Sequence, residues 1–310
     1  MTSPALLPEL QPQVSFKNIL LATDFSAASE KAFAYAVAVA RRHGSKITLA
    51  HVIPPDLVSL LPAPSAERRR DEEERQLEGL ASRSELNQIP HEAILRAGSV
   101  GSELSSVIRE QEIDLVILAT HGRSGLKKLV LGSVAEEVLR RAPCPVLTVG
   151  PHIDTTIGTT GKFSRILLAT DFHPASAKAL DYAVFLANES ETKLILLHVM
   201  PPTALAGPGQ SFYDEQAINE WEAQVRTNIR EKLERLLLPP AARLWSEPEY
   251  VVNFDFIGDG IVREAAARRA DLIIAGAKRP PFVKASAHTL GGVSYEVIRR
   301  ANCPVLTVSA

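Results

Sequence analysis

The chain has 310 residues, of which 45% are hydrophobic and 23% are charged, and its formal net charge is -2. This length predicts about two domains. The small net charge gives no reason to expect a nucleic-acid partner, and the absence of a long uninterrupted apolar run argues against a membrane span or a membrane partner.

In the first half, a proline-containing tail at 1–14 precedes short apolar runs that alternate with helical patterns. Strands are predicted at 19–23, 47–52, 92–97, 114–120 and 145–149, and helices at 27–42, at roughly 66–86, at 101–112 and at 134–142. This alternation predicts an α/β domain built on a doubly wound, parallel five-stranded sheet. The mixed charges at 66–76 indicate a solvated helix face, and Ser133 with Glu136 forms a capping-box pattern.

The second half of the chain repeats the first. ILLATDF occurs at 19–25 and again at 166–172, and RRAPCPVLTV at 140–149 has its counterpart in RRANCPVLTV at 299–308. Because the order and the spacing of the repeats are kept, we infer a domain duplication. The predicted organisation is a tail at 1–14, a first domain at 15–150, a linker at 151–162 and a second domain at 163–310.

The loop after the fourth predicted strand is the main candidate binding site. In doubly wound sheets, ligands bind beyond the carboxyl ends of the strands where strand order reverses, which points to Asp24 and to the segment from Ala119 onward. Gly122 and Gly132 let the backbone approach a ligand, and Gly132-Ser133 begins a helix whose N–H groups and dipole suit an anion. Positive charge is added by three neighbours, Arg123, Lys127 and Lys128.

Several polar residues have alternative interpretations. Asp24 could accept a hydrogen bond from a ribose hydroxyl or ligate a phosphate-bound metal, but it could equally cap the following helix or bind local backbone N–H groups. Ser133 could be only a helix N-cap. His121 lies in the loop and could approach a phosphate, whereas His51 and His198 are predicted to be structural residues at the ends of strands.

The loop and the segment after it resemble the universal stress proteins. The resemblance rests on ATHGRSG at 119–125 and LGSVAEEVLRRAPCPVLTV at 131–149, and it extends, in the tandem two-domain form, from about residue 17 to 310. ATP-binding members of that family have a Gly-x2-Gly-x9-Gly-(Ser/Thr) motif. Gly122, Gly132 and Ser133 match this motif, and Ala119 replaces its first glycine.

This resemblance implies a Rossmann-like, adenine nucleotide alpha hydrolase-like fold that binds ATP, with Mg or Mn as an accompanying ion. It implies that the phosphates are held by Gly122, Gly132, Ser133 and the following Val134. Asp24 and Val52 match positions that line the adenosine side. The loop residues His121 and Arg123 are candidates because of their position.

The second copy departs from this motif. Its aligned positions are Asp171, Val199, Gly276, Arg279, Gly291 and Gly292. Arg279 replaces the second glycine of the motif, and Gly292 replaces its hydroxyl residue. We therefore regard these positions as weaker nucleotide-binding candidates, and an altered or empty pocket is the alternative.

The last predicted strand of each copy is apolar and ends its domain. An exposed apolar edge strand favours aggregation, so we expect these strands to be covered. We predict that 146–149 pairs with 305–308, which gives an internal pseudo-dimer like the dimers of the family. The sequence does not settle whether two chains also form a homodimer.

Three functions are compatible with these patterns. The first is a cytoplasmic, ATP-binding stress-response protein that senses nucleotide, the second a slow ATPase or a phosphoryl- or adenylyl-transferring enzyme, and the third a nucleotide-independent dimer scaffold. We identify no catalytic constellation and no metal site made by the protein alone. Cys144 and Cys303 lie outside any metal-binding spacing, which favours structural thiols in a reducing compartment.

Overall fold

The computed structural model describes residues 14–55, 63–122, 131–151, 153, 161–188, 191–205, 215–237, 244–277 and 292–310. The elements of the first domain are β1 (Asn18–Ala22), α1 (Ala27–His43), β2 (Lys46–Ile53), α3 (Ala63–Ala81), a 3-10 turn at Ser84–Leu86, β3 (His91–Ala97), α4 (Val100–Glu110), β4 (Leu115–Ala119), α5 (Ser133–Arg141) and β5 (Val146–Val149). Those of the second domain are β6 (Arg165–Ala169), α6 (Pro174–Asn188), β7 (Lys193–Met200), a 3-10 turn at Pro202–Leu205, α7 (Glu215–Leu236), β8 (Glu249–Phe254), α8 (Ile257–Ala267), β9 (Leu272–Ala277), α9 (Val293–Arg300) and β10 (Val305–Ser309).

The strands form one ten-stranded sheet in the order β3-β2-β1-β4-β5-β10-β9-β6-β7-β8. Within each domain neighbouring strands are parallel, as the alternation of strands and helices predicts. The order reverses between β1 and β4 in the first domain and between β6 and β9 in the second. The predicted α/β fold class is therefore confirmed.

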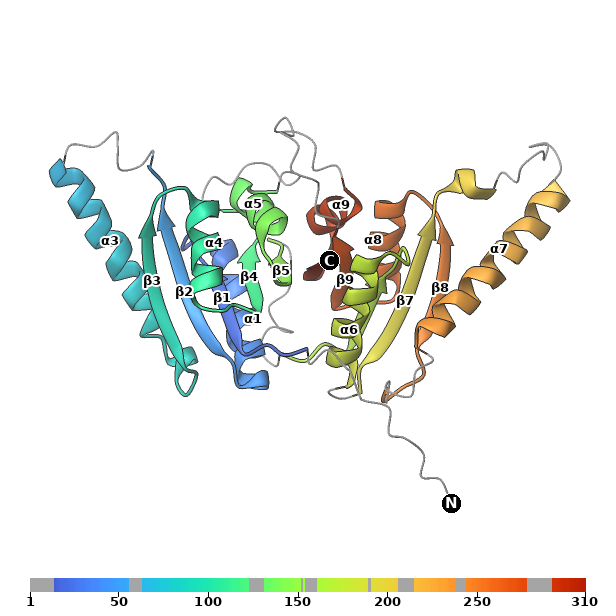
Figure 1. Ribbon diagram of the computed structural model, residues 1–310, viewed down its shortest axis with the longest axis horizontal. Coiled ribbons are helices and arrows are strands. Elements are labelled where there is room, and N and C mark those ends of the chain that lie inside the picture. The colour runs from blue at the N-terminus through green and yellow to red at the C-terminus, as the bar shows by residue number, and fades with distance from the viewer. Residues whose placement is uncertain are drawn as a thin grey trace, which may run out of the picture.

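The two domains join edge to edge at the centre of the sheet (Figure 1). β5 pairs antiparallel with β10, and Leu147 lies opposite Leu306. The Thr148 hydroxyl donates to the Val305 carbonyl over 3.1 Å, and the Thr307 hydroxyl donates to the Val146 carbonyl over 3.2 Å. The predicted pairing of 146–149 with 305–308 is thus present, and it buries both apolar edges.

Helices cover both faces of the sheet, and each face has a core that runs through both domains. One core packs α1, α3, α6 and α7 on the sheet, with Tyr35 and Leu233 among its buried residues. The other packs α4, α5, α8 and α9, with Leu104 and Val297. In Figure 1, α3 and α7 lie at opposite ends of the molecule. Within the described ranges, no helix has both the length and the hydropathy that a bilayer-crossing segment requires.

The helix predicted at roughly 66–86 begins three residues earlier and ends five residues earlier than these bounds. α3 begins at Ala63 and ends at Ala81, and a separate 3-10 turn follows. Arg83 breaks the helix because its backbone is extended, with φ -70° and ψ 141°. Its guanidinium forms ion pairs of 2.6 Å with both Glu30 and Glu85, which hold the break against α1.

The two cysteines differ in accessibility, which predicts different reactivity. Burial raises the pKa of Cys303 to about 12, whereas Cys144 is partly exposed. At pH 8 a thiol with that pKa is ionised to only about one part in ten thousand, and the thiolate is the nucleophile. We expect iodoacetamide to label Cys144 well before Cys303 in the folded protein, as peptide mass spectrometry would show. Equal labelling rates in the folded protein would contradict this assignment, and labelling in denaturant is the control.

Candidate functional site

A pocket of about 310 Å³ lies at the carboxyl ends of β1, β2 and β4, where the strand order of the first domain reverses. This is the position at which open α/β sheets bind ligands. The predicted site residues that line it are Asp24, Val52, Ala119, His121, Gly122, Gly132, Ser133 and Val134. Arg123 lies outside the described residues.

The turn after β1 fixes the carboxylate of Asp24. Asp24 Oδ1 accepts hydrogen bonds from the Ser26 N–H (3.1 Å) and from the Ser29 hydroxyl (2.5 Å). The cap of α1 is Ser26, whose hydroxyl accepts from the Ser29 N–H, so the helix-capping alternative for Asp24 is wrong. The alternative of binding local N–H groups is confirmed. Oδ2 points toward Gly122, because a Cβ built on that glycine would lie 2.6 Å from it.

The start of α5 differs from the capping-box prediction. Gly132 is the N-cap and Ser133 is the first helical residue, so the capping position has no side chain that could make a capping bond. The Gly132 N–H donates to the Thr120 carbonyl over 2.8 Å, so this N–H is already used within the protein. The first bond of the helix runs from the Glu136 N–H to the Gly132 carbonyl over 2.9 Å. The amides of residues 133–135 belong to the first turn, where an α-helix offers its own N–H groups no acceptor.

Part of the pocket wall is apolar. Its side chains come from β2, α4 and β4, namely Ala50, Val52, Val100, Leu104 and Leu118. The pocket therefore combines an apolar surface with a fixed carboxylate and a helix N-terminus. This combination of an apolar lining with a few positioned polar groups is typical of small-molecule sites.

Two pocket residues escaped sequence analysis, His51 and Glu73. His51 was predicted to be structural, and its Nδ1 is indeed bound to the Thr23 carbonyl over 2.8 Å, but its ring also lines the pocket. Glu73 belongs to the charged run at 66–76, yet it is only 2% exposed. The burial of Glu73 could have been predicted from the sequence, because Glu73, Leu77 and Leu80 recur at the four- and three-residue spacing of one helix face.

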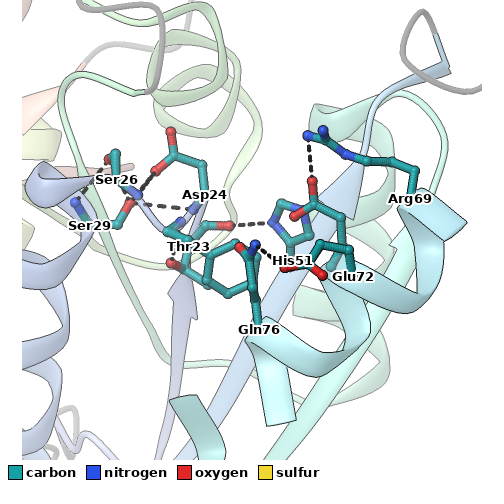
Figure 2. A network of polar contacts seen from close by, with 10 residues as sticks. Thr23, Asp24, Ser26, Ser29, His51, Arg69, Glu72 and Gln76 are labelled. Carbon is teal, nitrogen blue, oxygen red and sulfur yellow. Dashed lines mark hydrogen bonds and ion pairs between the residues drawn. The ribbon is translucent and has the colours of Figure 1, made fainter. Parts of the chain in front are cut away.

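These two residues join the pocket to α3. His51 Nε2 lies 3.3 Å from Glu73 Oε2, and Arg69 Nη2 lies 2.7 Å from Glu73 Oε1. Figure 2 shows His51 between Thr23 on the β1 side and Arg69 on α3. A continuous set of polar contacts thus connects the surface of α3 with the turn that holds Asp24.

The second domain repeats the turn after its first strand. Asp171 Oδ1 accepts from the His173 N–H (3.1 Å) and from the Ser176 hydroxyl (2.5 Å), as Asp24 does in the first domain. Asp171 is exposed, however, whereas Asp24 is half-buried in the pocket wall. The shared motif explains why the ATDF repeat is kept in both copies.

Protein packing occupies two of the other second-domain candidates. A Cβ on Gly276 would lie 2.5 Å from the Ser176 nitrogen, so this glycine lets α6 approach β9 closely. The Gly276 carbonyl accepts from the Ser294 hydroxyl of α9 over 3.1 Å. A Cβ on Gly260 would lie 2.7 Å from Val199, so α8 packs directly on that valine.

The remaining second-domain candidates are less informative. Gly292 is the N-cap of α9 and has open space around its Cα. Arg279 and Gly291 lie outside the described residues. In the part of the chain that the structure describes, no group of three or more His, Cys, Asp or Glu residues could hold a metal ion.

Comparisons with known proteins agree with this architecture. A sequence model of the universal stress protein family matches residues 15–150 and 162–309. A Staphylococcus haemolyticus protein named as a universal stress protein is 33% identical over 143 residues, which cover 44% of this chain and 86% of that protein. A crystal structure of a universal stress protein from Archaeoglobus fulgidus has the same fold over 95% of this chain and 97% of its own, with a TM-score of 0.70 and 24% identity. The chain therefore belongs to the universal stress protein family and contains two of its domains in tandem.

Proposed function

We propose that the first domain binds ATP and that the protein is a cytoplasmic nucleotide sensor of the stress response rather than an enzyme that turns ATP over rapidly. The observation that supports this most directly is the pocket at the strand-order reversal, which has a half-buried carboxylate on one wall and the start of α5 on another.

The adenine base would lie against the apolar wall, beside Val52 and Leu104. Asp24 would accept hydrogen bonds from the ribose, since its Oδ1 is already held by Ser26 and Ser29 and its Oδ2 points to Gly122. The phosphates would lie at the first turn of α5, where backbone N–H groups, the helix dipole and the Ser133 hydroxyl favour an anion. A divalent ion bound with ATP would supply further charge neutralisation there.

The way in which the polar groups of the pocket are used supports a sensing role. Asp24 is held by two local hydrogen bonds, and the Nδ1 of His121 lies 2.8 Å from the Thr120 hydroxyl. These contacts fix both side chains as walls of the site. In this proposal occupancy of the first domain is the signal, and the paired second domain is the part that is read by partners.

We expect about one ATP per chain to be released when freshly purified protein is denatured, as chromatography of the supernatant would measure. Asp24→Ala should remove most of this nucleotide, because it deletes the ribose acceptor. The matched change Asp171→Ala removes the same local hydrogen bonds in the second domain and should leave the ratio near one.

Protein that neither retains nor takes up ATP would overturn the proposal in favour of a scaffold. About two ATP per chain would show that the second domain binds nucleotide as well. Release of phosphate at a steady rate, lost in Asp24→Ala, would favour the ATPase alternative.

A further inference from the structure

His51 and Glu73 are buried, ionisable residues whose chemistry the proposed ATP site does not use. Their side chains are 5% and 2% exposed, and they face one another between β2 and α3. A carboxylate is seldom buried without a partner, because its transfer out of water is costly. The buried charge of Glu73 must therefore be stabilised by the groups that contact it, which are His51 and Arg69.

The hydrogen bond at Nδ1 fixes one proton of His51. The Thr23 carbonyl oxygen can only accept, so Nδ1 must carry a hydrogen and donate it. On the other side of the ring, Nε2 lies 3.3 Å from Glu73 Oε2, while Arg69 occupies Oε1. An attractive contact at Nε2 then needs one further proton, either on the imidazole or on the carboxyl group. Without it, a nitrogen lone pair would face a carboxylate oxygen.

The His51–Glu73 contact attaches the N-terminal part of α3, where few side chains are buried. Of the α3 side chains whose burial is described, those that are buried are Glu73, Leu77 and Leu80, and Glu73 is the closest to the N-terminus. Apolar packing thus holds the C-terminal half of the helix, whereas Glu73 holds the half beside the pocket. The described part of the second domain shows no counterpart of the His51–Glu73 pair. His198 repeats the bond to a threonine carbonyl (Thr170, 2.7 Å), but burial lowers its pKa, and Lys232 on α7 lowers it further.

We propose that His51 and Glu73 share one buried proton that holds α3 against the Thr23–Asp24 wall of the first-domain pocket, so that loss of this proton weakens ATP binding. This inference rests on the proposed function and adds regulation by pH to it. Among the described residues, the charged and titratable groups that we consider around the pair are Arg69 on α3 and, in the lining of the same pocket, Asp24 and His121. Asp24 favours the bound proton, whereas Arg69 and a protonated His121 oppose it. Glu73 is a positioning residue here, since it acts through His51 and Thr23.

The test compares ATP affinity from pH 5.5 to pH 9 in the wild type, Glu73→Gln and Glu73→Leu by calorimetry. Above the pH at which His51 and Glu73 lose their shared proton, the wild-type Kd for ATP should rise by up to about tenfold for each pH unit, as expected when one proton is linked to binding. In Glu73→Gln the amide N–H can donate to neutral His51, so the Kd should not follow this transition. Glu73→Leu should bind weakly at every pH. Because ATP itself titrates, the ratio of wild type to variant is the quantity compared.

A nucleotide-free measurement separates this inference from the proposed function. The ring nitrogens of His51, assigned by comparison with His51→Gln, should show a protonation step in the wild type that Glu73→Gln lacks in nuclear magnetic resonance spectra. The second-domain control Lys232→Gln should leave both readouts unchanged. Parallel affinity profiles in the wild type and Glu73→Gln, or the same His51 titration in both, would overturn the shared proton. Absence of ATP binding at every pH, with the His51 step still present, would overturn the proposed function instead.

Discussion

Gly122→Arg is expected to abolish ATP binding to the first domain while the chain stays folded. A Cβ at residue 122 would lie 2.6 Å from Asp24 Oδ2, and Asp24 cannot swing away without losing its bonds to Ser26 and Ser29. The remainder of the arginine side chain would enter the pocket that the nucleotide needs. We expect the Kd for ATP to rise by about 100-fold or more, or about 2.7 kcal/mol, in calorimetric titration.

Two further variants make this prediction specific. Gly122→Ala adds only the Cβ and should give a smaller loss, because Asp24 alone must move. Gly292→Ala, at the aligned loop of the second domain, meets open space and should leave ATP binding unchanged. Full affinity in Gly122→Arg would show that the nucleotide binds elsewhere. The substitution also introduces at position 122 the residue type that the second copy has at Arg279.

The fold was predictable because its signals are local and repeated. The buried strands are continuous apolar runs, and the two copies agree on where each begins. The repeated aspartate before β4 and β9 is an example. Asp114 accepts from the backbone N–H groups of Lys17 and Asn18, and Asp271 accepts from those of Ser164 and Arg165. The same tertiary bond recurs at the same sequence position, so the repeat encodes the adjacency of neighbouring strands.

The site was less predictable because its details depend on contacts between distant segments. The motif placed Gly132 at the phosphates, but the Thr120 carbonyl takes its N–H and moves the helix start by one residue. Glu73 was hidden in a charged run whose other members are mostly exposed. Its helical phase relative to Leu77 was visible in the sequence, whereas its partner His51 could be found only from the packing of α3 on β2.

In the second copy, the residue that matches the first glycine of the motif has a packing role. Gly276 matches the first glycine of the motif. Its lack of a side chain allows α6 to pack closely against it, because the α6 backbone would clash with a Cβ at this position. The first domain has Ala119 at this position and still forms the pocket. A glycine at the first position of the motif can therefore serve close helix packing as well as ligand binding. A motif match alone does not distinguish the two roles.

Gly161→Ala is expected to destabilise the whole chain, although residues 151–162 were predicted to be only a linker. Gly161 has a φ of +62°, and a Cβ there would clash with the Ala38 carbonyl oxygen, in the backbone of α1. The left-handed conformation costs alanine about 1 kcal/mol, and forcing a methyl group against a helix backbone adds about 1–3 kcal/mol. We expect the free energy of unfolding in urea to fall by about 2–4 kcal/mol in total.

Gly44→Ala is the matched control for this prediction. Gly44 caps α1 with a φ of +67°, but a Cβ there would have no neighbour within 4 Å. This variant therefore has the conformational cost alone, about 1 kcal/mol. The difference between the two variants isolates the contact of the connecting segment with α1, which ties the start of the second domain to the first beyond the β5–β10 pair. Equal losses of stability in the two variants would contradict the close approach of Gly161 to the backbone of α1.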